Sequence, residues 1–358
     1  IYLEFPLKLM ATELKMSKSD TVYIQGRYFD ANISLLPLFS GRVEANYISL
    51  EKFDVNTRNI LPDVAVEGKV GYMRVVARDA DFANAVANIR QLHIMDSDLN
   101  ITLSDTTASE ESEPLQWVIN LRKGSIKNSH IEISLPHDTL NVEAYIENLH
   151  LRKGRLNIPE TNFSIKEIAL CNSRVRYDKG DETPQQAPLD HIRLENININ
   201  ANDLKFAGSN DISANITTFT LEQPEGLAVT NAAVHLTSRN DTLQLHKLEI
   251  DSRNGSRVCG ESTIPQQALI NPNDKGFTAK LSARINKQDL SKLVTEQMYD
   301  NLHYFDKQLL NAELAFSGNL QRIKIDTLAL DFPGTGALNA NGSVELKAKN
   351  SNGSIAFN

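Results

Sequence analysis

Residues that could do chemistry are few in this chain, and they are scattered. The sequence contains no nucleophile elbow, zinc-protease helix, Walker loop or dinucleotide-binding glycine loop. His235 and His246 have no second ligand at a useful spacing, and we expect both at the surface or at strand ends. Glu110, Glu111 and Glu113 could attract calcium weakly, but a solvated acidic loop is the favoured interpretation. The sequence therefore predicts no enzyme, no catalytic residue, no metal and no cofactor.

The two cysteines and the single tryptophan narrow the function further. Cys171 and Cys259 lie far apart without a CxxC spacing, which argues against a structural zinc site or a redox pair. We expect two small packing residues rather than a disulfide. Aromatic residues make up 6% of the chain, and Trp117 is its only tryptophan. A protein that grips sugars by stacking needs more flat aromatic faces, so a glycan adhesin is disfavoured.

Charge and hydropathy exclude other classes. The formal net charge is −8, and no run of Lys or Arg reaches the length of a nucleic-acid footprint or a polybasic membrane patch. No stretch approaches the roughly 18–20 apolar residues that cross a bilayer. The chain opens at Ile1 and stops at Asn358 inside a patterned segment. We expect a fragment of a longer protein, with any membrane anchor or export signal upstream.

A short repeat recurs along the chain. It has the form h-x-h-x-x-h-x-h, where h is apolar, and each half alternates as a strand with one apolar face does. The apolar positions that we expect to line one continuous surface are Ile48, Leu50, Phe53, Val55, Ile89, Leu92, Ile94, Ile146, Leu149, Leu151, Ile165, Ile168, Leu170, Ile192, Leu194, Ile197, Ile199, Ile216, Phe219, Leu221, Leu243, Leu245, Leu248, Ile250, Ile323, Ile325, Leu328 and Leu330.

The two-residue spacer inside each copy must re-phase the second half of the strand. Spacers such as Glu51-Lys52, Lys166-Glu167, Thr217-Thr218 and His246-Lys247 are poor formers of a tight hairpin turn. A β-bulge re-phases a strand equally well and also bends it. We therefore predict long, bent strands whose apolar side chains all point to the inside of the curve.

Turns and one helix complete the predicted architecture. We expect turns at 96–98, 179–181, 254–255 and 341–342, and a turn of helix at 35–39. The stripe of apolar residues over 289–310 predicts a helix with Asp289 as its N-cap, which covers a sheet edge or plugs the groove. The fold class is all-β: an elongated antiparallel meander of roughly 18–22 strands, bent into a U-shaped groove with an apolar interior and one or two short helices.

The residues resemble a known family. The stretch 33–56 (ISLLPLFSGRVEANYISLEKFDVN) resembles the start of TamB and AsmA-like proteins. Residues 189–229 resemble the central repeats of the TamB-like proteins of Bacteroidota, and 285–332 resemble the family's helix and the strand pair after it. The resemblance implies a repeating β-groove at 1–285 and 313–358, with a helical insertion at 286–312 that caps or plugs it.

The resemblance also implies a function. TamB and AsmA-like proteins are anchored in the inner membrane, extend through the periplasm and are linked to phospholipid delivery to the outer membrane. The implied partners are phospholipids and an outer-membrane barrel of the Omp85 class, and we expect the regions that would meet the inner membrane and that barrel to lie outside this sequence. No nucleic-acid partner is expected.

Alternatives and one modification stay open at this point. The chain could be a scaffold for outer-membrane protein assembly that offers strand edges, or a self-packed β-sandwich or β-helix fragment of a surface adhesin. Asp-Thr pairs followed by an aliphatic residue or Thr resemble the O-glycosylation site of exported Bacteroidota proteins, although the same pair also begins many strands. The candidate residues are Thr21, Thr106, Thr139, Thr242 and Thr327.

Overall fold

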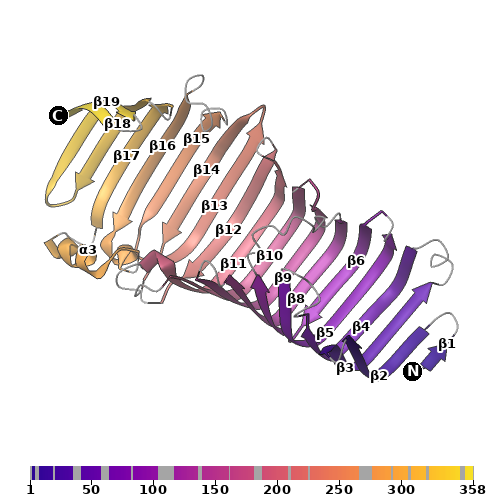
Figure 1. Ribbon diagram of the computed structural model, residues 1–358. Coiled ribbons are helices and arrows are strands. Elements are labelled where there is room, and N and C mark those ends of the chain that lie inside the picture. The colour runs from indigo at the N-terminus through magenta and orange to yellow at the C-terminus, as the bar shows by residue number, and fades with distance from the viewer. Residues whose placement is uncertain are drawn as a thin grey trace. The chain divides into compact units, whose positions relative to one another are not determined.

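The protein is all-β, and its strands follow one another in two compact units (Figure 1). The computed structural model describes residues 2–4, 8–18, 21–34, 42–57, 64–81, 84–103, 117–135, 139–160, 162–180, 188–208, 211–224, 226–265, 276–291, 293–304, 308–319, 322–346 and 351–357. Unit 1 comprises 1–182 with 190–197, and unit 2 comprises 183–189 with 198–358. The all-β class is therefore confirmed.

Unit 1 is a sheet of long strands. They are β1 (Tyr2–Glu4), β2 (Lys8–Lys18), β3 (Thr21–Ser34), β4 (Arg42–Asn56), β5 (Val64–Asp81), β6 (Val86–Met95), β7 (Asp98–Leu103), β8 (Val118–Leu135), β9 (Leu140–Asn157), β10 (Asn162–Lys179) and the first part of β11 (His191–Ala207). Successive strands from β1 to β6, and from β8 to β10, pair antiparallel as the meander predicts.

One junction in unit 1 departs from the antiparallel meander. β6 and β7 both pair with β5, and both pair with β8 in parallel, so β6 and β7 form one strand interrupted by a bend. The register matches each residue to the one 32 positions later, as in Val86 opposite Val118 and Thr102 opposite Ser134. Parallel neighbours need a connection of about a dozen residues or more, and the chain between β7 and β8 is long enough.

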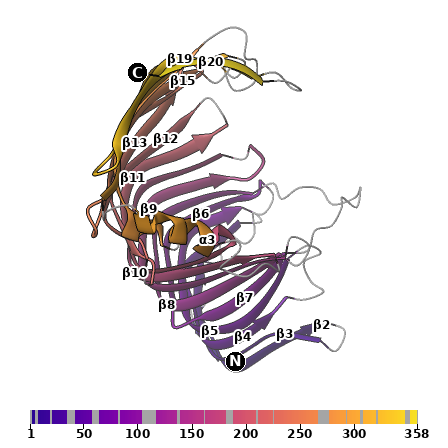
Figure 2. The ribbon, with the colours of Figure 1, turned by 90° about the vertical axis from the view of Figure 1, so that its left-hand side faces the viewer.

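Bends rather than turns shape the strands of unit 1. Seven residues within these strands, or at the β6–β7 junction, have a left-handed backbone with φ between 46° and 57°. They are Glu13, Lys52, Asp96, Asn128, Lys153, Asn172 and Asn196. Asn and Asp reach this region at the lowest cost among non-glycine residues. The bending of the strands in unit 1 can be followed in Figure 2.

The side chains that follow these residues show which way the strands bend. Phe53, Ser97, Ser129, Ser173 and Ile197 each come directly after a left-handed residue, and they are only 1%, 3%, 1%, 2% and 5% exposed. All five positions belong to the apolar phase of their strands. Such crowding is expected at the inside of a corner, and we infer that the apolar face of unit 1 is the concave one.

Three corners share one hydrogen-bond motif. The buried hydroxyl groups of Ser97, Ser129 and Ser173 donate to the carbonyl oxygens two residues earlier, at 3.0, 2.8 and 3.1 Å. A small hydroxyl residue fits the crowded corner and satisfies its own polar group there. The same Asp/Asn-Ser pair therefore forms the corner in β6–β7, β8 and β10.

Unit 2 is a second all-β unit. It contains the rest of β11, then β12 (Ile212–Glu222), β13 (Ala228–Arg239), β14 (Thr242–Ser252), β15 (Arg257–Pro265), β16 (Phe277–Asn286), β17 (Gln308–Gly318), β18 (Arg322–Phe332), β19 (Gly336–Leu346) and β20 (Ser351–Phe357). Every successive pair from β12 to β20 is antiparallel. The 3-10 turn η2 (Pro188–Asp190) precedes β11.

The predicted spacers are re-phased in two ways. In unit 1 the register of β6 against β5 slips at Arg90-Gln91, which confirms the predicted bulge at that spacer. In unit 2 the register slips at Thr217-Thr218, His246-Lys247 and Asp326-Thr327, which confirms the predicted bulges there. In unit 1 the pairs on either side of Lys52 keep one register, and the pairs around Lys166 do the same. The prediction of a bulge is wrong at these two spacers. Neighbouring strands bend at the same level, so no extra residue is needed.

Two of the predicted turns are wrong. Residues 96–98 form a corner, because β7 continues in the direction of β6. Asn341 and Gly342 lie within β19, paired with β20 on one side and with β18, at Gly342, on the other. The turn at 254–255 between β14 and β15 is confirmed, with Gly255 at φ 91°. In the predicted turn at 179–181, Gly180 at φ 70° directly follows the end of β10, and residue 181 lies outside the described residues. The predicted helical turn at 35–39 lies outside the described residues.

The predicted helix over 289–310 is also wrong in its extent. The structure places η3 (Lys287–Leu290), α3 (Glu296–Asp300) and η4 (Asn301–Tyr304) between β16 and β17, and Leu309 and Leu310 already belong to β17. The side chain of Thr295, rather than that of Asp289, caps α3 by accepting from the N–H group of Met298. Asp289 is instead 2% exposed inside η3. The apolar spacing of 289–310 mixed residues of short helical turns with those of a strand, which explains the error.

Candidate functional site

A continuous apolar surface covers one face of unit 1. Cross-strand partners lie on the same face of a sheet, so the register traces the surface directly. One row crosses eight strands, which are β2 to β6 and β8 to β10. Its members are Ala11, Phe29, Leu50, Met73, Ile94, Ile126, Leu149 and Leu170. A second row beside it runs through Ala31, Ile48, Val75, Leu92, Gly124, Leu151 and Ile168.

Unit 2 has an apolar face of the same kind. One row crosses the strands from β12 to β19 through Ile216, Val234, Leu248, Gly260, Leu281, Leu314, Leu328 and Ala340. Its neighbour includes Phe219, Ile250, Val258 and Leu330.

The predicted lining residues are all described, and most are only half-buried. Phe53, Ile197, Leu221 and Ile325 are buried, at 1%, 5%, 9% and 9% exposure, and every other predicted position is intermediate. A core side chain beneath a second sheet would be almost fully covered. In the part of the chain that the structure describes, each unit has a single layer of strands, and no second sheet packs on the apolar rows.

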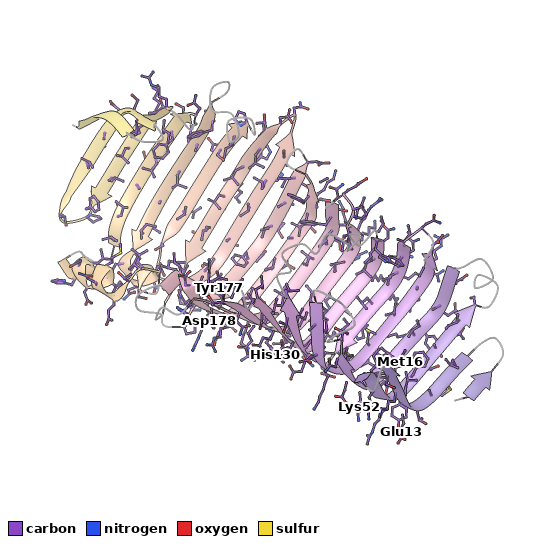
Figure 3. The ribbon with its side chains drawn as sticks, viewed as in Figure 1. Glu13, Met16, Lys52, His130, Tyr177 and Asp178 are labelled. Atoms are coloured by element: carbon purple, nitrogen blue, oxygen red, sulfur yellow. The ribbon has the colours of Figure 1, made fainter. Side chains whose placement is uncertain are left out.

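The opposite face is polar. Long side chains extend from it along the strands, and Figure 3 shows Glu13 and Lys52 together at the bend of unit 1. These two residues line a depression with Lys15, Arg27 and Asp54, where cations and carboxylates alternate. The two faces therefore differ as the alternation of the sequence predicts.

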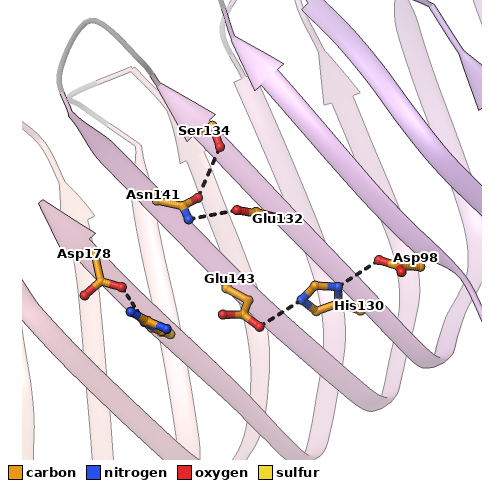
Figure 4. A network of polar contacts seen from close by, with 8 residues as sticks. Asp98, His130, Glu132, Ser134, Asn141, Glu143 and Asp178 are labelled. Atoms are coloured by element: carbon orange, nitrogen blue, oxygen red, sulfur yellow. Dashed lines mark hydrogen bonds and ion pairs between the residues drawn. The ribbon is translucent and has the colours of Figure 1, made fainter.

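A polar network connects three strands of unit 1 on this outer face (Figure 4). The Nδ1 atom of His130 lies 2.9 Å from a carboxylate oxygen of Asp98, and its Nε2 atom lies 3.1 Å from Glu143. The hydrogen bond with Asp98 is the main cause of a raised pKa at His130, with a further contribution from Glu143 against the opposing effect of burial. The guanidinium group of Arg174 lies 4.7 Å from the ring centroid of Tyr145 in the adjacent part of β9 and β10.

A second ion pair of unit 1 holds Asp178. Its carboxylate accepts from His191 at 3.0 Å and from Arg176 at 2.5 Å. Burial alone would raise the pKa of Asp178, but these two hydrogen bonds and the charges of both partners outweigh it, so the pKa is lowered. Both networks join side chains of neighbouring strands, so we interpret them as structural.

The other residues singled out in the sequence lie as follows. His235 and His246 lie on β13 and β14 with their ring centroids 4.8 Å apart, and His246 contacts the hydroxyl of Thr237 at 2.7 Å. Both side chains are exposed, which confirms the expected surface position, and both lie within the strands and not at their ends. Cys171 and Cys259 are both free thiols. Among the described side chains, no group of three His, Cys, Asp or Glu residues could hold a metal ion.

The five candidate modification sites occupy different environments. Thr139 and Thr327 are exposed, Thr242 is half-buried, and its hydroxyl donates to the Asn240 carbonyl at 3.4 Å. Thr21 begins β3. Thr106 lies outside the described residues, as do Glu110, Glu111 and Glu113.

One cluster was missed by sequence reasoning. Five cations from β5, β6, β8 and β9 line a single depression on the outer face of unit 1. They are Arg78, Arg90, Arg122, Lys153 and Arg155. They are far apart in the sequence, so a search for basic runs passes over them. Only Arg90 lies at a spacer of the repeat, so the strand pairing, and not a spacing in the sequence, brings the five cations together.

The comparisons with known proteins do not assign the chain. No family model matches it, and no curated protein matches it. Within the described part of the chain, no helix is both long enough and apolar enough to cross a bilayer.

Proposed function

We propose that the chain is a segment of a bridge-like lipid transfer protein of the TamB/AsmA type, whose apolar face conducts phospholipid acyl chains. The observation that carries the proposal is the half-exposed aliphatic surface, which runs from strand to strand in each unit without a second protein layer among the described residues. Acyl chains can supply the missing layer, at roughly 0.8 kcal/mol for each CH₂ group buried.

The form of the surface suits movement along it. The rows that were traced consist of aliphatic residues with a few Phe and Gly, and none of their members carries a polar side chain. Each strand therefore offers an acyl chain nearly the same contact as the next, at a spacing of about 4.8 Å. A lipid can then advance without deep energy minima, while its charged headgroup stays in water. The drive must come from a gradient or another protein, and we propose no catalytic role.

The cellular setting belongs to the same proposal. A protein of this type would lie in the periplasm, anchored in the inner membrane, and would support outer-membrane biogenesis together with an Omp85-type barrel. Its O-glycosylation at an exposed Asp-Thr site, such as Thr139 or Thr327, would fit an exported protein.

The alternatives predict other burial patterns. A self-packed sandwich or β-helix would cover Leu50, Ile146, Leu194 and Leu245 with a second layer, yet all four are half-buried. A scaffold for outer-membrane protein assembly would work through strand edges, and it needs no continuous aliphatic surface. Neither alternative explains why the apolar rows extend across eight strands.

Lipid binding can be tested on the whole chain. We expect phospholipid to co-purify with it and to be detected by mass spectrometry after extraction. A photo-crosslinking residue at Leu149 should form lipid adducts, whereas one at Glu147, which is exposed on the outer face, should not.

A matched pair of variants completes the test. L149D places a carboxylate in the apolar row and should reduce bound lipid, while H150D places the same group on the outer face and should not. Adducts only at the outward position, or a lipid-free protein that cannot be loaded, would reject the proposal.

A further inference from the structure

The cations of the outer face in unit 1 are aligned across four strands. Ile89 and Leu92 of β6 pair with Leu121 and Gly124 of β8, which places Arg90 opposite Arg122. The pairs of Leu121 with Gly154 and of Lys123 with Arg152 place Arg122 opposite Lys153 of β9 in the same way.

The row extends by one more strand and widens on one side. The register of β10 against β9 places Lys166 opposite Lys153. Arg155 and Arg78 lie beside the row and line the same depression, together with the amide side chains of Asn88 and Asn120. Those two amides are joined by a hydrogen bond of 2.9 Å. Arg78, Arg90, Arg122, Lys153 and Arg155 are all exposed, and together they are called the basic row below.

The basic row is costly for the sheet. Like charges directly opposite each other on neighbouring strands are destabilising, and here they meet at two successive strand pairs, Arg90 with Arg122 and Arg122 with Lys153, about 4.8 Å apart. No described acidic side chain lines the depression, and no ion pair among the described residues involves any of its five cations. The carboxylate of Glu167, which follows Lys166 on β10, is paired with Arg152 at 2.8 Å. Among the described residues, the five cations therefore have no carboxylate partner that would offset this repulsion.

The positive field extends further along the same strands. His93 of β6 has a lowered pKa, mainly because it is partly buried and also because of the nearby charges of Lys127 and His150. The whole chain, in contrast, has a net charge of −8. A local excess of cations on an acidic protein creates a positive field that would attract an anionic partner.

We propose that the basic row is a docking surface for the phosphate-bearing surface of an anionic membrane. Four of its five cations are arginines, whose planar guanidinium groups match the geometry of phosphate oxygens better than lysine does. The row is exposed and shallow and lies on the face opposite the apolar rows, so it suits an extended layer of headgroups rather than one enclosed ligand. Docking there would hold unit 1 against a leaflet while leaving its apolar face free.

The experiment is vesicle co-sedimentation with the full chain. Vesicles of phosphatidylcholine alone are compared with vesicles of equimolar phosphatidylcholine and phosphatidylglycerol. We expect binding to the anionic vesicles only, falling as salt is added. In the triple variant R90Q/R122Q/K153Q, the partition coefficient should fall by roughly a hundredfold, because each cation near an anionic surface contributes about a factor of five.

The matched control removes the same charge elsewhere in unit 1. K15Q/R27Q/K52Q changes three cations of the depression that also contains Glu13 and Asp54, and it should bind as the parent chain does. The charge-preserving variant R90K/R122K/K153R should still bind the anionic vesicles. Its binding would show that substitution at these three positions does not itself unfold the protein. Far-UV circular dichroism compares all variants.

Several results would overturn the proposal. These are equal binding to both kinds of vesicle, no binding to the anionic ones, or equal loss in the two triple variants. Saturable binding of poly-glutamate by the basic row without vesicle binding would also reject it, because the partner would then be an acidic polypeptide. L149D should leave vesicle docking unchanged, so a failure of the lipid-conducting proposal is distinguishable from a failure of this one.

Discussion

The ring of Phe53 lies directly over the backbone of Gly26 on the neighbouring strand. The two residues are cross-strand partners, and Phe53 is 1% exposed at the inner side of the bend in β4. A Cβ atom built on Gly26 would lie 2.4 Å from two carbons of the ring. Because Gly26 has no side chain, the ring of Phe53 on the neighbouring strand fits against its backbone at the bend of the sheet.

Replacing Gly26 should destabilise unit 1. In G26A the added methyl group must displace the Phe53 ring, and overpacking of this kind costs about 1–3 kcal/mol. Chemical denaturation followed by circular dichroism measures the loss. G336A is the control, because a Cβ atom there meets nothing within 4 Å. Equal stability of the two variants would show that the ring moves aside without cost.

The left-handed corners predict a substitution that stabilises. Lys52 has φ 56°, a backbone conformation that is strained for any residue with a Cβ atom. Its side chain is exposed and therefore contributes little packing. K52G should gain about 0.5 kcal/mol, since relief of about 1–2 kcal/mol exceeds the extra entropy of the unfolded chain. K69G, at an exposed strand position without a positive φ, should instead lose about 0.5–1 kcal/mol. The same denaturation assay compares both, and a loss in K52G would mean that the corner is not strained.

The sequence predicted the faces of the strands better than their connections. The apolar phase of positions such as Leu50 and Leu149 follows from period-two alternation, which depends only on local geometry. The spacer positions were also predicted, but whether a spacer becomes a bulge or a left-handed corner depends on whether the neighbouring strand bends at the same level. That information lies in the pairing, so the corner at Lys52 could not be told from the bulge at His246-Lys247.

The basic cluster on the outer face could not be predicted from the sequence for the same reason, because it depends on strand pairing. Arg90 and Arg122 are 32 positions apart, and only the parallel register of β6 and β8 makes them neighbours. Composition, with its net charge of −8, argued against any basic surface. The prediction of one helix over 289–310 was wrong for a related reason. Leu309 continues the helical spacing of apolar residues, but its pairing with the sheet makes it part of β17.

Asp289 provides a third prediction. Its buried carboxylate accepts from the hydroxyl groups of Ser252 at 2.5 Å and Ser256 at 2.6 Å, and from the amide of Asn254 at 2.8 Å. It thereby ties η3 to the turn between β14 and β15. D289A would leave three donors without a partner and should destabilise unit 2 by about 3 kcal/mol. D300A, at an exposed position in α3, should stay within about 0.5 kcal/mol of the parent in the same denaturation assay. A D289A variant as stable as D300A would mean that water replaces the carboxylate.

The fourth prediction concerns the pH dependence of unit 1. The pKa of His130 is raised above its ordinary value of about 6.5, first by the hydrogen bond to Asp98 and then by the one to Glu143. Its charged form is therefore favoured in the folded state. The resulting stability is fully present below the unfolded pKa of about 6.5 and is lost as the pH rises through the higher folded value.

NMR titration of the histidine ring protons tests this directly. His130 should titrate above pH 6.5 and His93, whose pKa is lowered, below it. D98N should lower the pKa of His130 more than E143Q does, because the bond to Asp98 is the larger cause. H130Q should lose stability relative to the parent most strongly at acid pH, and the difference should shrink as the pH rises through the folded pKa. If the difference grew toward alkaline pH instead, the neutral ring would be the bound form and the network would have to be reassigned.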